Sequence, residues 1–243
     1  MALTAASLFH ALREDASRFG VTVSAAQAET YERFATLLLE RNTSVNLTAI
    51  TAPADVARKH VLDSLTALAV RRWSGTERVI DVGTGAGFPG LALRIALPGI
   101  RLTLVESVGK KARFLEEAVG TLGLTGVDVQ NARAEELAAV RRASYDIGLA
   151  RAVTTIGGDL EYLLPFLAVG GEAIIWKGRI DLELPGARAA LADLGGELTA
   201  LISTESLGVG DLLPGRNLVV ARKTRRTPER YPRRAVEARR RPW

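Results

Sequence analysis

From about residue 77 onward, short β-type runs alternate with helical segments, and this alternation constrains the fold more than any other feature. Runs such as "RVIDVG" and "RLTLVES" are separated by helix-type segments such as "GLALRIAL". Alternation at this spacing is typical of βαβ units in a parallel sheet with helices on both faces. The last two runs, "ELTALISTESL" and "RNLVVARK", are separated by a loop too short for a crossover helix and are expected to pair antiparallel. The sequence therefore predicts an α/β fold with a seven-stranded, mostly parallel sheet and an antiparallel terminal hairpin.

The first 75 residues carry helix signals instead. Ser24 and Gln27 have the spacing of a capping box at the start of "SAAQAETYERFATLLLER", and "ADVARKHVLDSLTALAV" repeats apolar residues at helical intervals. The Asn- and Thr-rich stretch between them, "RNTSVNLTAITAP", is expected to be a loop. We therefore expect a small helical region at 1–75, a sheet domain at 76–223 and a tail at 224–243.

The basic residues of the chain are concentrated at its C-terminus. Residues 221–243 hold ten Arg or Lys against two Glu, whereas the whole chain has a net charge of only +5, so the rest is acidic. A tail that is rich in Arg and Pro and poor in apolar residues is expected to be disordered when free and to attract polyanions. The alternative is a solvated extension with no specific task.

The composition excludes several classes of chemistry. The chain has no cysteine and two histidines, which rules out iron–sulfur clusters, cysteine-ligated zinc and a cysteine nucleophile, so no metal is expected. No apolar run approaches the roughly 20 residues that span a bilayer, and the N-terminus lacks the basic start and cleavage site of a secretory signal. We expect a cytoplasmic protein without a membrane partner, and a monomer because no obligate interface is indicated.

The glycine-rich turn "DVGTGAGFPG" follows the first strand, where an α/β sheet of this kind binds its ligand. Its glycines, Gly83, Gly85 and Gly87, are out of register with the dinucleotide fingerprint, and no Walker lysine follows. Asp81 ends the strand, and its carboxylate would repel a pyrophosphate but attract a cationic ligand. S-adenosylmethionine carries an ammonium and a sulfonium and no phosphate. The turn therefore favours that cofactor.

Two further strand ends fit a nucleoside. Glu106 lies about twenty residues past the turn, where a carboxylate accepts both ribose hydroxyls in NAD enzymes and methyltransferases alike. Ala134 and Glu135 follow the third strand and are expected beside the adenine. The alternatives are a solvated Glu106 and a Glu135 that only caps its helix.

Taken together, the motifs resemble the glucose-inhibited division protein B family, also called RsmG. The segments that carry the likeness are "RNTSVNLTAI", "KHVLDSL", "DVGTGAGFPG", "LVESVGKKARFLEE", "ARAEE", "LARAV" and "GRNLVVARK", from about residue 30 to 223. The resemblance implies a Rossmann-like class I methyltransferase. It also implies transfer of a methyl group from S-adenosylmethionine to N7 of one guanine in bacterial 16S rRNA, within the small ribosomal subunit, leaving S-adenosylhomocysteine.

The resemblance also assigns cofactor contacts to Gly83, Phe88, Ala134, Glu135 and Arg151. Guanine N7 has an in-plane lone pair and no proton, so its methylation needs no general base, and positioning remains as the source of catalysis. We expect Arg151, at the end of the fourth strand, to form the cofactor and base pocket, through guanine O6 or the cofactor carboxylate. The alternative is a surface salt bridge.

N7 lies on the major-groove edge, which A-form RNA hides, so the target must be unstacked or in a loop. His60 and Asp63 are expected to form a local pair, and Trp176 to lie in the core. The two asparagines among the expected RNA contacts have the alternative of stabilising their own turn. The expected RNA contacts are Asn42, Asn46, Arg58, Lys59, Lys177 and Arg216.

Other function classes stay open at this point. A methyltransferase of another RNA or of a small molecule has the same cofactor turn. An NAD(P)-dependent oxidoreductase explains the sheet and Glu106, but neither Asp81 nor the lack of a Tyr–Lys or His pair. A non-enzymatic RNA-binding protein would use the tail and leave the cofactor turn without a task.

Overall fold

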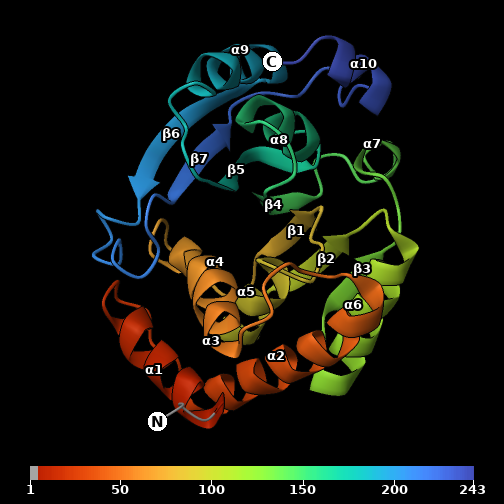
Figure 1. Ribbon diagram of the computed structural model, residues 1–243. Helices are drawn as coiled ribbons and strands as arrows, with labels where there is room; N and C mark the ends of the chain where they lie inside the picture. The colour runs from red at the N-terminus through yellow and green to blue at the C-terminus, as the bar shows by residue number, and fades with distance from the viewer. Residues whose placement is uncertain (1–4) are drawn as a thin grey trace.

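Seven strands form one sheet in the order β3-β2-β1-β4-β5-β7-β6 in the computed structural model, which describes residues 5–243 (Figure 1). Strands β1 to β5 pair in parallel, and β7 pairs antiparallel with both β5 and β6. This confirms the predicted sheet and its terminal hairpin. The strands are β1 (Arg78–Val82), β2 (Arg101–Val105), β3 (Val127–Gln130), β4 (Tyr145–Arg151), β5 (Leu167–Lys177), β6 (Gly196–Ser203) and β7 (Asn217–Lys223).

Helices cover both faces of the sheet (Figure 1). The N-terminal helices, α5 and α6 share one hydrophobic cluster with one face, and α7, α8 and α9 share a second cluster with the other. No helix within residues 5–243 is both long and apolar enough to cross a bilayer. The helices are α1 (Ala5–Ser17), α2 (Ala25–Val45), α3 (Pro53–Asp55), the π-helix η1 (Val56–Leu62), α4 (Asp63–Leu65), the 3₁₀ helix η2 (Thr66–Leu68), α5 (Gly90–Ala96), α6 (Gly109–Leu122), α7 (Ala134–Leu137), α8 (Ile156–Leu163), α9 (Leu184–Leu194) and α10 (Ala235–Arg240).

The N-terminal helices belong to the same core as the sheet. Phe34 and Leu62 are fully buried in the cluster that contains Leu102 of β2. The capping box of Ser24 and Gln27 is present at the start of α2. That helix continues to Val45, so the loop begins later than the Asn- and Thr-rich composition predicts. Within the described part of the chain, residues 5–75 are thus a helical layer of the sheet domain.

The C-terminal tail is folded onto the domain, which corrects our expectation that it is disordered. Arg142 donates to the carbonyls of Thr227, Pro228 and Tyr231, and the Tyr231 ring is buried. The segment then forms α10 beside α8 (Figure 1). The composition is misleading because a few anchors, rather than an apolar face, hold the tail in place.

The strand order places the candidate site. From β1 the chain moves outward to β2 and β3, and then returns to the other side of β1 with β4. The carboxyl ends of β1 and β4 therefore flank the point at which the strand order reverses, where ligands bind in sheets of this type.

Candidate cofactor and substrate site

The turn after β1 is held open by its glycines and by hydrogen bonds to β2. Gly83, Gly85 and Gly87 all have φ between 60° and 94°, a region that side chains disfavour. The N–H groups of Gly83 and Thr84 donate to the carbonyl of Val105 at the end of β2. This arrangement brings bare backbone to the carboxyl edge of the sheet, as the sequence predicts.

Asp81 lies beneath this turn, inside the protein. Its Oδ2 accepts hydrogen bonds from Thr84 Oγ1 at 2.7 Å and from the N–H of Gly90 at 2.8 Å. The side chain is fully buried, and this burial raises its pKa to about 6. The expected direct contact with a cationic ligand is thereby corrected: Asp81 ties the turn to the first residue of α5.

Glu106 supports the same turn from β2. Its Oε2 accepts from the N–H of Gly85 at 3.1 Å, and its Oε1 accepts from the N–H of Val108 at 2.8 Å. The carboxylate is therefore not free in solvent. Because each carboxylate oxygen has two acceptor positions, it retains capacity for a ribose hydroxyl.

Two hollows meet at Gly83. The first, here called the Glu135 hollow, has a volume of about 140 Å³ and is lined by Val82, Gly83, Val105, Ser107, Ala132, Arg133, Ala134, Glu135, Val153, Tyr162 and Ala235. The second, the Arg151 hollow, has a volume of about 330 Å³ and is lined by Leu47, Thr48, Ile50, Lys59, His60, Asp63, Gly83, Thr84, Gly85, Ala86, Phe88, Lys111, Arg151, Ala152 and Arg216.

Each hollow has its own character. The Glu135 hollow has both apolar and polar lining residues and contains the Ala134–Glu135 pair that the sequence assigns to adenine. The Arg151 hollow combines four cationic side chains with one buried carboxylate, that of Asp63. The site thus joins a smaller hollow of mixed polarity to a cationic one across a glycine turn.

Arg151 is the centre of the cationic hollow. Its Nη1 donates to the carbonyl of Lys59 at 3.2 Å and to Asp63 Oδ2 at 3.1 Å, and its Nη2 donates to His60 Nδ1 at 3.0 Å. Burial lowers the pKa of Arg151, and the charge of Asp63 opposes that effect. Since a guanidinium has five N–H donors, two remain for a ligand after these three bonds. The geometry favours a ligand-binding role over a surface salt bridge.

We had expected His60 and Asp63 to pair with each other. Instead, each of them binds Arg151. Burial, reinforced by the charge of Arg151, lowers the pKa of His60 to about 3. The ring is therefore neutral. Because Arg151 can only donate, Nδ1 of His60 accepts and Nε2 carries the proton, which it donates to Thr48 Oγ1 at 2.8 Å.

Phe88 forms the floor of the Arg151 hollow. Its ring stacks between Phe34, at 4.9 Å between centroids, and His60, at 4.7 Å. The guanidinium of Arg151 lies 5.6 Å from the ring centroid. With both faces covered, Phe88 positions His60 and Arg151 and has no face available for a base.

The expected RNA contacts separate into two groups. Lys59 and Arg216 line the Arg151 hollow. Asn46 and Arg58 do not line it. Asn46 is exposed and caps the end of α2 with a φ of 56°. The charge of Arg58 acts on Asp15 of α1.

Asn42 has the turn-stabilising role that we had kept as its alternative. Its Oδ1 accepts from the N–H groups of Leu47 and Thr48, and its Nδ2 donates to the carbonyl of Thr48. It thereby holds two residues that line the Arg151 hollow. We infer that Asn42 acts on the site through this loop.

Lys177 is buried, which corrects its assignment as an RNA contact. Its Nζ donates to the carbonyl of Thr154 and lies 3.2 Å from Asp159 Oδ2. Oδ1 of Asp159 accepts from both the N–H and the hydroxyl of Thr154. The pair thus fixes the loop between Arg151 and α8. Trp176, the preceding residue, lies in the core as predicted.

Replacing Lys177 with methionine is expected to lower the free energy of unfolding by about 3 kcal/mol, because Asp159 is left buried and unpaired. The double variant Lys177→Met/Asp159→Asn, which removes the orphaned charge, is expected to lose less. Urea unfolding of the three proteins measures this difference. Equal losses in the single and double variants would contradict the buried pair.

Several lining residues have no counterpart among the sequence-predicted contacts. Thr48 and Lys111 line the Arg151 hollow from the α2–α3 loop and from α6, and Tyr162 lines the Glu135 hollow from α8. Lys111 belongs to the "GKKARF" segment, whose place after β2 is a signal that the sequence did offer. Thr48 and Tyr162 reach the site only through tertiary packing.

Comparison with known proteins gives a consistent result. The family model described as rRNA small subunit methyltransferase G matches residues 27–200. A protein of Pelotomaculum thermopropionicum is 44% identical over 239 residues, which cover 97% of this chain and 98% of the relative. One of Alkaliphilus oremlandii is 41% identical over 227 residues, covering 92% and 94%. Both are named ribosomal RNA small subunit methyltransferase G.

Solved structures share the fold at low sequence identity. The [4+2]-cyclase SpnF has a TM-score of 0.57 and 16% identity, covering 82% of this chain and 96% of that one. A putative methyltransferase in complex with the Haloferax volcanii Trm112 activator has a TM-score of 0.58 and 16% identity, covering 77% and 98%. These likenesses show a Rossmann-like α/β fold.

Proposed function

The chain belongs to the rRNA small subunit methyltransferase G family, and from this premise we propose that it methylates N7 of one guanine in 16S rRNA of the small ribosomal subunit. It is an S-adenosylmethionine-dependent methyltransferase. The oxidoreductase and the non-enzymatic RNA-binding protein are thereby set aside. The choice of RNA, base and atom is the proposed part.

The observation that supports the proposal most strongly is the meeting of the two hollows at Gly83. A Cβ atom at Gly83 would lie 2.8 Å from Val153 Cγ2, so only glycine leaves the space between the turn and the loop after β4. S-adenosylmethionine fits this arrangement, with its adenosine in the Glu135 hollow and its methionine end at the turn. When bound, it supplies an electrophilic methyl group.

The cofactor contacts expected from the sequence are carried forward with this arrangement. Gly83, Ala134 and Glu135 line the Glu135 hollow, and Gly85 faces the Arg151 hollow. Gly87 lines neither hollow and supports the turn from below. A Cβ there would lie 2.6 Å from Leu91 Cδ1, so glycine at this position allows α5 to pack against the turn.

The residues of the Arg151 hollow suit an unstacked guanine. The two remaining N–H donors of Arg151 can bind guanine O6 or hold the methionine carboxylate. Lys59, Lys111 and Arg216 supply positive charge for the flanking phosphates. N7 carries no proton, so none of these groups has to act as a base, and the neutral His60 serves to orient Arg151.

We also propose that the protein acts as a monomer in the cytoplasm, where small ribosomal subunits are made. Its large exposed apolar side chains, within the described part of the chain, come from separate elements and segments, as scattered surface apolar residues do on monomers. They are Val108, Val140, Val169, Leu182, Leu201 and Val236.

The substrate class is tested with methyl-labelled S-adenosylmethionine. Small subunits from a strain that lacks the modification are compared with large subunits and with small subunits that already carry it. Label is expected only in the first. Equal labelling of large subunits would contradict the proposed substrate while leaving the methyltransferase activity intact.

A further inference from the structure

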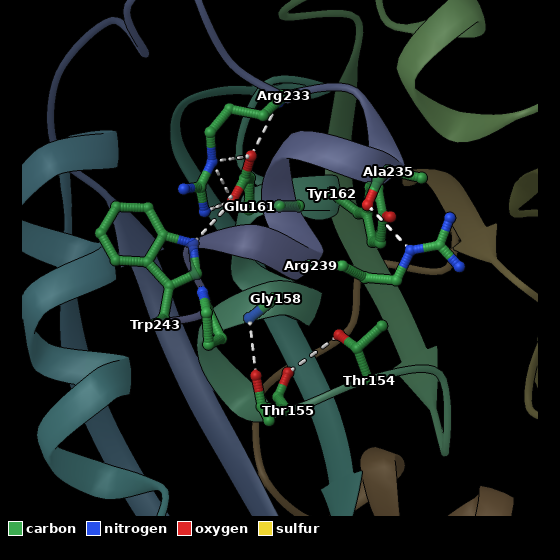
Figure 2. A pocket seen from close by; sticks show the side chains of 11 residues that line it. Thr154, Thr155, Gly158, Glu161, Tyr162, Arg233, Ala235, Arg239 and Trp243 are labelled. Atoms are coloured by element: carbon green, nitrogen blue, oxygen red, sulfur yellow. Dashed lines mark hydrogen bonds and ion pairs between the residues drawn. The ribbon is translucent and has the colours of Figure 1, made fainter.

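The last eleven residues, 233–243, form a segment that we call the C-terminal strap. Its two ends are bound to one carboxylate, that of Glu161 on α8 (Figure 2). Arg233 donates to Glu161 Oε1 from its backbone N–H at 2.7 Å and from Nε at 2.9 Å, and its Nη2 lies 2.5 Å from Oε2. The indole Nε1 of Trp243 donates to the same Oε2 at 2.6 Å. Glu161 is only 2% exposed, so its charge is matched inside the protein by the strap.

Two glycines make room for the final residue of the strap. A Cβ at Gly157 of α8 would lie 2.4 Å from Trp243 Cβ, and a Cβ at Gly186 of α9 would lie 2.6 Å from the Trp243 carbonyl carbon. Glycine in a helix costs about 0.5–1 kcal/mol relative to alanine. The shape of this groove between α8 and α9 is therefore complementary to Trp243.

The docked strap reaches the cofactor site. Its hollow against α8 has a volume of about 390 Å³ and is bordered by Tyr162 and Ala235 (Figure 2). The same two residues also line the Glu135 hollow. Ala235 lies two residues after Arg233, so the ion pair with Glu161 fixes its position. Without the strap, the Glu135 hollow would lose Ala235 from its lining and would be open on that side, while Tyr162 of α8 would remain.

We propose that the C-terminal strap is the outer wall of the adenosine end of the cofactor site, and that Glu161 is the positioning residue that holds it there. The inference rests on the proposed placement of the adenosine in the Glu135 hollow. The strap restricts release of S-adenosylmethionine and S-adenosylhomocysteine while leaving the groups around Arg151 unchanged. Of its arginines, Arg233 serves as the anchor to the fold.

Two variants disturb the strap by different routes. Deletion of 233–243 removes Ala235 from the hollow outright, and Gly157→Ala displaces Trp243 from its groove while Arg233 keeps its ion pair with Glu161. Gly120→Ala is the matched control, because Gly120 also lies in a helix and has nothing within 4 Å of its added Cβ. Binding of S-adenosylhomocysteine is measured by calorimetry, and docking of the strap by its rate of cleavage with trypsin.

Deletion of 233–243 is expected to weaken S-adenosylhomocysteine binding by about tenfold, the value for an uncovered apolar patch of roughly 50 Å². Gly157→Ala, which loosens only the Trp243 end, is expected to weaken it less. The KM for S-adenosylmethionine should rise while kcat at saturation changes little, and trypsin should cleave the Gly157→Ala strap faster. Wild-type affinity in the deletion variant would overturn the inference. Failure of the wild-type protein itself to bind S-adenosylhomocysteine would instead contradict the cofactor site.

Discussion

Replacing Arg151 with alanine is expected to reduce the rate of methyl transfer at least about 100-fold, the effect of removing one preorganised charged donor from a reacting group. The side chain joins Asp63, His60 and the carbonyl of Lys59, and it lines the hollow. Its loss removes the group that orients the base or the methionine carboxylate. Single-turnover rates on undermethylated small subunits measure the effect.

The matched variant is Arg151→Lys, which keeps the charge but not the planar fork, and we expect it to recover only a small part of the activity. Arg151→Ala also leaves Asp63 buried without its partner, so the unfolding free energy should fall by about 3 kcal/mol. Asp63→Asn in the same background should return part of this stability but none of the activity. Rapid turnover by folded Arg151→Ala would contradict the assigned role.

The second large effect is expected from Gly83→Ala, which should weaken binding of S-adenosylhomocysteine by about 100-fold or more. The φ angle of Gly83 is 71°, and the added Cβ would lie 2.8 Å from Val153 Cγ2, where the two hollows meet. The methyl group therefore both strains the turn and closes the passage between the hollows. Calorimetric titration gives the affinity directly.

Gly75→Ala is the control for backbone strain alone. Gly75 has a φ of 80°, and nothing lies within 4 Å of its added Cβ. The Gly75→Ala variant should have a free energy of unfolding about 1–2 kcal/mol lower, because alanine disfavours the left-handed backbone. It should bind S-adenosylhomocysteine with the affinity of the wild-type protein. Equal loss of affinity in both variants would show that general destabilisation, and not the passage at Gly83, explains the result.

The fold could be predicted because its signals are local. The alternation of strands and helices and the short final loop determine the order of elements, and the capping box of Ser24 and Gln27 marks the start of α2. The glycine turn could be placed for the same reason, since it directly follows β1.

The errors concern charged residues whose environment depends on distant segments. Lys177 lies at a strand end, as a ligand contact would, but Asp159 and Thr154 enclose it in the interior. Asp81 has the charge expected of a cofactor contact, yet the turn folds over it. The tail is polar enough that its composition predicts disorder. Its partner, Glu161, is more than seventy residues away in sequence, so no local pattern reveals the contact that holds it.

The measurement that tests the account most directly is cleavage of the RNA at the modified base. Undermethylated small subunits are incubated with the protein and S-adenosylmethionine, and the 16S rRNA is then treated with borohydride and aniline, which cut at N7-methylguanosine. The account predicts one new cleavage site, absent with Arg151→Ala. Incorporation of methyl groups into the RNA without any cleavage would contradict methylation at N7.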